Sequence, residues 1–322
     1  MDCCAECGKE EGGVSLKTCT SCKLVRYCNA KCQRNHWAKH KKTCKQHAAE
    51  LHDEALFKDP PPKEECPMCF LPMPVNLICC ISLPSATVSS VPIFDLAEAY
   101  EDFAEMETEE YYSCCGKGIC RGCIHSFGLA GNVGKCPFCN SDRGCKTDAE
   151  RVAEMMKRVE AQDASAMNQL AQNYYFGGAG LLQDHAKAVE LWKQAVALGS
   201  SQAHFCLAEA YRHELEDLKK AHFHYEAAAV AGHEVARCNL GSIERKSGNM
   251  ELVLKHLRIA ASAGDYAAMN FIRKFFERGV VSRESIDSTL TAYNNSCVEM
   301  RSEARDAYIH IIMRMHESTN NS

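Results

Sequence analysis

The stretch "SAMNQLAQNYYFGGAGLLQDHAKAVELWKQAVALGS" (165–200) carries the pattern that decides the fold of the larger part of the chain. Two segments of similar length, 201–233 and 234–265, follow it and align with it. Each segment has a glycine at or near its end: Gly199, Gly232 and Gly264. A period of this length predicts stacked helix pairs, because one pair alone cannot bury its apolar face.

Equivalent positions in these segments alternate bulky and small side chains. An alanine marks the first predicted helix of each unit: Ala166, Ala203, Ala236 and Ala268. The second helix has a bulky position, at Trp192, Tyr225 and Leu257, and a small one, at Ala195, Ala228 and Ala260. A bulky side chain over a small one lets successive helices interlock, and the glycines stand where a helix must stop. A degraded fourth unit starting at Tyr266 is predicted to cap the array.

The segment "LAQNYYFGGAGLLQDHAKAVELWKQAVALG" (170–199) resembles the Sel-like repeat, a relative of the tetratricopeptide repeat. The resemblance implies an α-solenoid over residues 149–315, with a concave surface that scaffolds protein complexes, and a flexible tail over 316–322. We expect no catalytic site here, since "FGGAG" (176–180) lacks the lysine and hydroxyl residue of a phosphate-binding loop. The histidines and cysteines of this half are interpreted as packed or solvated helix residues: His204, His222, His224, His233, Cys206 and Cys238.

The rest of the chain has a different chemistry. Of 22 cysteines, nineteen fall in residues 1–145. The N-terminus "MDCCAECGKE" has no secretory signal pattern, so these cysteines are predicted to be zinc ligands rather than disulfides. We therefore expect an intracellular protein, cytoplasmic or nuclear. The uncharged stretch 75–94 contains Pro84 and Pro92 and is rich in Ser and Thr, which argues against a membrane span.

The middle of the chain, residues 64–145, contains three C-x-x-C pairs and the sequence "CCGKGICRGC" (114–123), after a proline-rich linker over 45–63. These residues resemble a RING-type cross-brace finger, although Lys117 stands where a histidine ligand belongs. The resemblance implies one zinc held by Cys66, Cys69, Cys120 and Cys123. The second would be held by Cys114, Cys115, Cys136 and Cys139, with His125, Cys79 and Cys80 in reserve. A finger with a single zinc site is the alternative.

RING-type fingers often recruit a ubiquitin-conjugating enzyme, and the resemblance would give this contact to Met68 and Pro137. Asn140 stands where a basic residue commonly follows the last ligand, which weakens the assignment to a ligase. An insertion, "DLAEAYEDFAEMETEEYY" (95–112), carries eight acidic residues and no lysine or arginine. Its apolar residues recur at helical spacing, which predicts an acidic amphipathic helix or a loop that folds on contact.

The front of the chain pairs its potential ligands closely: Cys4 with Cys7, Cys19 with Cys22, Cys28 with Cys32, and His40 with Cys44. Eight ligands suffice for two tetrahedral zinc ions. Residues four apart share one face of a helix, so "CQRNHWAKHKKTC" (32–44) is predicted to be helical, and by spacing either His36 or His40 could be the ligand. About 40 residues bury too little apolar surface to be stable alone, so we expect zinc to decide whether this segment folds.

With "YC" (27–28), "CQ" (32–33), Trp37 and "HK" (40–41), residues 4–44 resemble the MYND-type zinc finger. The resemblance implies one zinc on Cys4, Cys7, Cys28 and Cys32, and another on Cys19, Cys22, His40 and Cys44. It also implies partners that are proteins or short proline-containing peptides. The lysines of the helix are interpreted as a solvated face rather than a nucleic-acid surface.

These expectations describe small zinc-stabilised domains followed by an all-α solenoid, with up to four structural zinc ions. The predicted function is a protein-interaction scaffold without a small-molecule substrate. One alternative is a RING-type ubiquitin ligase whose repeats hold the substrate, and another is a transcriptional or chromatin adaptor. The three module types in this order also resemble multi-module proteins of diatoms and related algae.

Overall fold

The structure is a computed structural model, and it describes residues 3–10, 15–74 and 108–320. The chain divides into two compact units, Met1–Asp59 and Pro60–Ser322. The first contains the front finger (residues 4–44). The second contains the middle finger (residues 64–145) and the helical array (α4 to α13). Among the described helices, none has the length and apolar character needed to cross a membrane, and the stretch 75–94 lies outside the described residues.

The first unit is built around a short hairpin and one long helix. Strand β1 (Lys17–Thr18) pairs antiparallel with β2 (Arg26–Tyr27). Helix α1 (Ala30–Leu56) begins at Asn29, whose side chain accepts a hydrogen bond from the Cys32 backbone N–H. The predicted helix over 32–44 is present, and it continues through residues 45–56, which were expected to be part of a linker. Its buried side chains are His40, Cys44 and Leu56.

The middle finger has a hairpin of β3 (Glu109–Tyr112) and β4 (Lys117–Cys120), followed by helix α3 (Arg121–Phe127) and the π-helical turn η3 (Gly128–Asn132). The predicted acidic helix over 95–112 is therefore wrong for its last four residues. Tyr111 and Tyr112 favour the strand, where they pair with Gly118 and Lys117. Residues 95–107 of that prediction lie outside the described residues.

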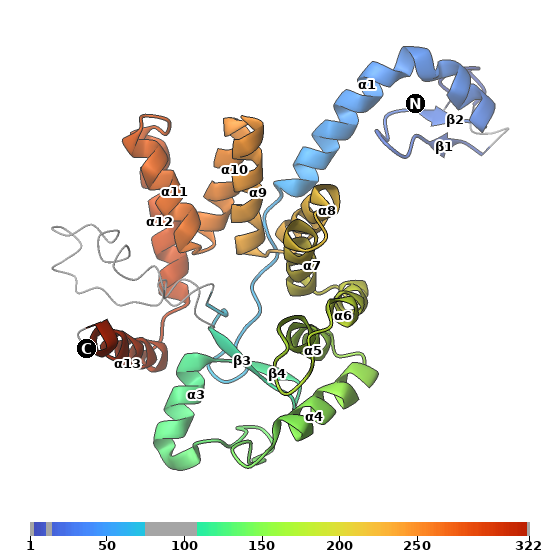
Figure 1. Cartoon of the computed structure of the whole chain (residues 1–322). Coiled ribbons are helices and arrows are strands. Elements are labelled where there is room, and N and C mark those ends of the chain that lie inside the picture. The colour runs from blue at the N-terminus through green and yellow to red at the C-terminus, as the bar shows by residue number, and fades with distance from the viewer. Residues whose placement is uncertain (1–2, 11–14, 75–107, 321–322) are drawn as a thin grey trace. The chain divides into compact units, whose positions relative to one another are not determined.

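The helical array follows the middle finger, and from α4 to α12 each helix packs against its neighbour in sequence (Figure 1), whereas α13 packs against α3. The helices are α4 (Asp148–Glu160), α5 (Ala164–Phe176), α6 (His185–Ala197), α7 (Ser201–His213), α8 (Leu218–Val230), α9 (Glu234–Ser247), α10 (Met250–Ser262), α11 (Tyr266–Glu277), α12 (Arg283–Glu299) and α13 (Glu303–Asn320). The predicted α-solenoid is confirmed, and helix α13 continues through residues 316–320, which were expected to be a tail.

The repeat positions form the core of the array. The bulky residues of the second helices are at most 2% exposed: Trp192, Tyr225 and Leu257. The alanines predicted at the small positions are fully buried: Ala166, Ala195, Ala203, Ala228, Ala236, Ala260 and Ala268. Trp192 also donates its indole N–H to Asn168 Oδ1 at 3.0 Å. The periodic pattern thus marks the residues that hold consecutive helices together.

The junction between repeats has a recurrent geometry. Gly232 and Gly264 adopt φ values of +93° and +94°, a region that only glycine enters without strain. The residue after each glycine donates its backbone N–H to a buried alanine carbonyl, His233 to Ala228 and Asp265 to Ala260. The same residue then caps the next helix, because its side chain accepts the N–H of Ala236 or Ala268. One residue therefore closes one helix and starts the next.

Residues 60–63, at the start of the second unit, pack against these junctions. Pro61 lies beside Gly232, so that a Cβ added to the glycine would stand 3.2 Å from the proline ring. Lys63 Nζ donates to the carbonyl of Ala263 at 2.5 Å and forms an ion pair with Glu234 at 3.0 Å. This part of the predicted linker is thus bound along the array.

Candidate metal centres

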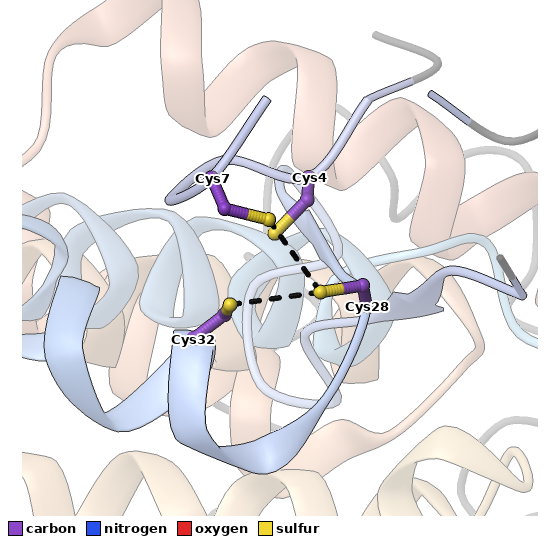
Figure 2. Close-up of side chains that lie close together, drawn as sticks. All are labelled: Cys4, Cys7, Cys28 and Cys32. Carbon is purple, nitrogen blue, oxygen red and sulfur yellow. Dashed lines mark hydrogen bonds between the residues drawn. The ribbon is translucent and has the colours of Figure 1, made fainter. Parts of the chain in front are cut away.

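The first cluster gathers Cys4, Cys7, Cys28 and Cys32 (Figure 2). Cys28 precedes helix α1 and Cys32 lies in its first turn. The Sγ atoms of Cys7 and Cys28 are 3.6 Å apart, and those of Cys28 and Cys32 are 3.5 Å apart. A tetrahedral zinc ion with Zn–S bonds of about 2.3 Å sets its sulfurs about 3.8 Å apart. The spacing of these thiols fits that ion.

The second cluster gathers Cys19, Cys22, His40 and Cys44, all of them buried. Cys19 and Cys44 have their Sγ atoms 3.8 Å apart, and His40 Nε2 lies 3.2 Å from the Cys22 Sγ. His36 is outside the cluster: its ring stacks on His40, and its Nδ1 lies 2.9 Å from the hydroxyl of Tyr27. The structure therefore places His40 with the cysteines, and it gives His36 a different partner.

The third cluster gathers Cys66, Cys69, Cys120 and Cys123 of the middle finger. The Sγ atoms of Cys69 and Cys120 lie 4.0 Å apart. Cys120 ends strand β4 and Cys123 lies in α3, so the hairpin and the helix carry this pair to the turn that holds Cys66 and Cys69.

The fourth cluster gathers Cys114, Cys115, Cys136 and Cys139. The two adjacent cysteines occupy the turn between β3 and β4, and Cys115 Sγ lies 3.7 Å from Cys136 Sγ. Lys117 does not belong to the cluster, because its Nζ stands 4.6 Å over the ring of Phe138. His125 is also outside it, near Tyr308, and Cys79 and Cys80 lie outside the described residues.

Four of the five C-x-x-C pairs sit in the same kind of turn, and the exception is Cys120 with Cys123, because Cys123 lies in helix α3. The first cysteine accepts a backbone hydrogen bond, of 2.8–3.0 Å, from the residue after the second cysteine. That residue has a positive φ in all four turns: Gly8, Lys23, Phe70 and Asn140. Positive φ strains a lysine or a phenylalanine and is better tolerated by asparagine. The repeated turn points both sulfurs of a pair at one centre, as a shared metal ligand site requires. The positive φ required at this position also explains why an asparagine, Asn140, follows the last cysteine pair.

The thiols of the front finger do not ionise alike in the absence of metal. The backbone N–H of Cys7 lowers the pKa of Cys4 to about 6. The hydrogen bond with Cys28, together with burial, raises the pKa of Cys32 to about 12. Burial and the contact with Cys19 raise the pKa of Cys44 to about 12. One thiolate forms readily in such a cluster, and its negative charge then holds the remaining protons on their sulfurs.

In chemical terms, the four clusters are closed sites that are suitable for zinc. Each offers four donor atoms within 4.8 Å of one another, all thiol sulfur except for one imidazole nitrogen. Thiolate and imidazole are the donors of structural zinc sites, which have no open position for a substrate. The two clusters of each finger also interleave their pairs along the chain.

Comparison with known proteins assigns the first module. Residues 4–44 match the family model of the MYND finger. The class defined by fold and sites is a zinc-finger protein with a helical-repeat array. A relative, the SET and MYND domain-containing protein DDB_G0277331 of Dictyostelium discoideum, is 48% identical over 46 residues. That match covers 13% of this chain, and the chain spans 8% of the relative's length.

Two solved structures are similar to part of this chain. The first is c5321, a protective antigen of uropathogenic Escherichia coli that displays an SLR fold. It is 23% identical with a TM-score of 0.41, and the match covers 57% of this chain and 38% of that one. The second is a Sel1 repeat protein from Oxalobacter formigenes, 18% identical with a TM-score of 0.42 over 55% of this chain and 70% of that one. The assignment of the solenoid therefore rests on the helix pairs and buried repeat positions described above.

Sequence reasoning missed two arginines that contact the middle finger. Arg158 of α4 donates to backbone carbonyls beside the fourth cluster, and Arg305 of α13 donates to sulfurs of the third. Neither lies in a motif, and both are far from the cysteines in sequence. Only the folded chain brings them together.

Proposed function

We propose that this protein is a zinc-dependent scaffold that holds protein partners through its front finger and its helical array. The observation that carries the proposal is the closed form of the four clusters, which together supply sixteen donor side chains and leave no coordination position for chemistry. A helical-repeat array offers an extended surface for proteins. In this proposal the four clusters described above are the zinc ligand sets, and the metal is structural.

For the front finger we propose short proline-containing peptides as partners. The family match over residues 4–44 supports this assignment. Trp37 and Leu24 are each 43% exposed, so apolar contact area is available on this unit. The zinc-loaded full chain should enrich proline-containing sequences from a display library of short peptides. The Cys28→Ser variant should lose this enrichment, while Cys139→Ser, which alters the middle finger, should keep it. Equal enrichment of sequences without proline would reject the peptide class.

A second candidate function is ubiquitin ligation through the middle finger, with Met68 and Pro137 at the contact with a conjugating enzyme. The interleaved pairs of the third and fourth clusters support a RING-type cross-brace. Phe70, Leu129 and Val133 are 71%, 74% and 82% exposed and could widen an apolar contact. The test is autoubiquitination by the zinc-loaded chain with a panel of conjugating enzymes. Absence of ubiquitin chains with every enzyme would reject this candidate.

A further inference from the structure

Both ends of the helical array contact the middle finger. The last helix, α13, packs against α3 of the finger, and the first helices, α4 and α5, pack beside β3 and the turn that follows it (Figure 1). An array whose first and last helices contact one small domain is closed by that domain. The finger in turn is expected to depend on metal for its own structure, because four of the six buried apolar residues of its core are cysteines of the third and fourth clusters.

At the C-terminal end the contact centres on Arg305. Its side chain is 2% exposed. Nε donates to the Sγ of Cys120 and Nη2 to the Sγ of Cys69, both at 3.4 Å. Nη1 donates to the carbonyl of Pro72 at 2.9 Å and also to that of Met300. One buried guanidinium therefore joins two donor sulfurs of the third cluster to the backbone on both sides of the contact.

The packing around Arg305 is close. A Cβ added to Gly122 of α3 would stand 2.6 Å from the backbone N and Cα of Arg305. His125, one turn further along α3, has its ring 5.9 Å from that of Tyr308. Helix α13 thus approaches α3 as closely as a glycine allows, and no larger residue fits at 122 without moving one of the two helices.

At the N-terminal end a second arginine makes the contact. Arg158 of α4 donates through Nε to the carbonyl of Ser113 at 3.2 Å and through Nη2 to that of Cys114 at 2.9 Å. The hydroxyl of Ser113 donates to Glu154 at 2.9 Å, and that of Tyr111 donates to Asp163 at 2.7 Å. These hydrogen bonds fix the turn that carries the adjacent cysteines of the fourth cluster to the start of the array.

The hydrogen bonds of Arg305 to the third cluster depend on the charge of that cluster when it holds zinc. Four thiolates around one zinc dication carry a net charge of about −2, which a buried guanidinium compensates through charge-assisted hydrogen bonds. Without the metal, nothing holds the sulfurs of Cys69 and Cys120 in place beside Arg305, and a buried arginine whose acceptors move away loses the hydrogen bonds that offset its desolvation. Groups that hydrogen-bond metal ligands typically change metal affinity by about 10–100-fold when they are removed.

We propose that the middle finger is a zinc-dependent clasp that ties the first and last helices of the array to one domain. Arg305 and Arg158 are its positioning residues. Loss of metal from the third cluster releases α13, and removal of Arg305 accelerates loss of that metal. The clasp goes beyond the scaffold function, because it concerns the chain's own ends and requires no partner.

Hydrogen exchange of the zinc-loaded full chain tests the release of α13. In the Cys69→Ser variant, amide exchange of α13 should rise at least about tenfold. The Cys7→Ser variant alters the front finger instead, and it should leave α13 unchanged. Gly122→Ala keeps every ligand and should also release α13, whereas Gly128→Ala should not, because its added Cβ would meet only Val133 at 3.7 Å.

The kinetics of zinc transfer to a chromogenic chelator test the positioning role. Arg305→Gln should release one of the zinc ions about tenfold faster. Arg314→Gln, the same change at an exposed position of the same helix, should match the unmodified chain. Unchanged α13 exchange in both Cys69→Ser and Gly122→Ala would overturn the clasp. Unchanged zinc release in Arg305→Gln would overturn the role of the arginine.

Discussion

The Nδ1 atoms of His204 and His224 lie 3.0 Å apart across the interface of α7 and α8. One of the two nitrogens must donate and the other accept, so at least the accepting ring must be neutral, and the contact is lost if both rings are protonated. The ring of Tyr211 stacks on His224 with an interplanar angle of 7°. Burial lowers the pKa of His204, and burial followed by the charges of His204 and Lys193 lowers that of His224 to about 4.

This pair should make the stability of the array depend on pH. The unfolded chain takes up a proton near the ordinary histidine pKa of 6.5, whereas folded His224 resists protonation until about pH 4. The contribution is therefore complete above pH 6.5 and is lost as the pH falls toward 4. We expect a loss of about 1–2 kcal/mol from His224, because the ring is only partly buried. Urea unfolding between pH 7 and 5 measures it.

The matched variants for this effect are His224→Gln and His310→Gln. His224→Gln should make the pH dependence of stability shallower without removing it, because burial also lowers the pKa values of His233 and His256, whereas replacement of the exposed His310 should leave it as in the unmodified chain. Identical pH slopes in His224→Gln and the unmodified chain would show that the pair does not control the effect.

The two histidines of the front finger should differ when each is replaced. His40→Ala removes the imidazole that lies 3.2 Å from Cys22 Sγ, and native mass spectrometry should show one zinc ion fewer. His36→Ala removes the hydrogen bond with Tyr27 and the stacking on His40 but no proposed ligand, so it should cost about 1 kcal/mol and leave the zinc content unchanged. Loss of a zinc ion from His36→Ala, with none lost from His40→Ala, would reverse the assignment.

Zinc loading of the first cluster should release protons. The pKa of Cys28 is raised, mainly by burial, and that of Cys32 is raised to about 12 by its contact with Cys28. Both thiols are therefore protonated at pH 7 and must lose their protons to bind metal. Calorimetric titration of the metal-free chain with zinc in two buffers of different ionisation enthalpy counts these protons. A heat that is independent of the buffer would contradict the expectation.

Substitution by alanine should destabilise the array to different extents at two of the repeat glycines. Both Gly199 and Gly264 have a positive φ, so each substitution introduces backbone strain of about 1 kcal/mol. An alanine at 264 would also meet the end of the buried Met300 side chain at 2.5 Å, whereas nothing lies within 4 Å at 199. We expect Gly264→Ala to lower the free energy of unfolding by about 1 kcal/mol more than Gly199→Ala. If urea unfolding shows the same decrease in the free energy of unfolding for both variants, the Met300 side chain moves aside without destabilising the array.

The repeat core was predictable because its information is local and periodic. Bulky residues recur at one position of the repeating unit, at Trp192, Tyr225 and Leu257. This period can be recognised in the sequence without knowing how the array packs against the rest of the chain. The extension of α1 to Leu56 was also within reach, since residues 45–56 contain neither glycine nor proline. The error at β3 arose because acidic and apolar residues at helical spacing outweighed two adjacent tyrosines. That strand depends on its pairing with β4, which a one-dimensional pattern does not contain.

The placement of Arg158 and Arg305 could not be predicted for a different reason. Arg305 contacts Cys120 across 185 residues of sequence, and the contact exists only because distant segments of the second unit meet in the fold. Spacing rules describe neighbours on one helix or in one turn. Such rules cannot predict how one end of the helical array packs against the middle finger.

The junction residues have a consequence for how the array comes apart. Because His233 and Asp265 each belong to two helices at once, fraying of one helix pair removes the cap of the next. The interfaces between repeats therefore carry more of the stability than any single pair, which in a one-dimensional chain of units favours all-or-none unfolding. Helices α5 to α12 should then unfold in one cooperative transition rather than one after another from an end of the array.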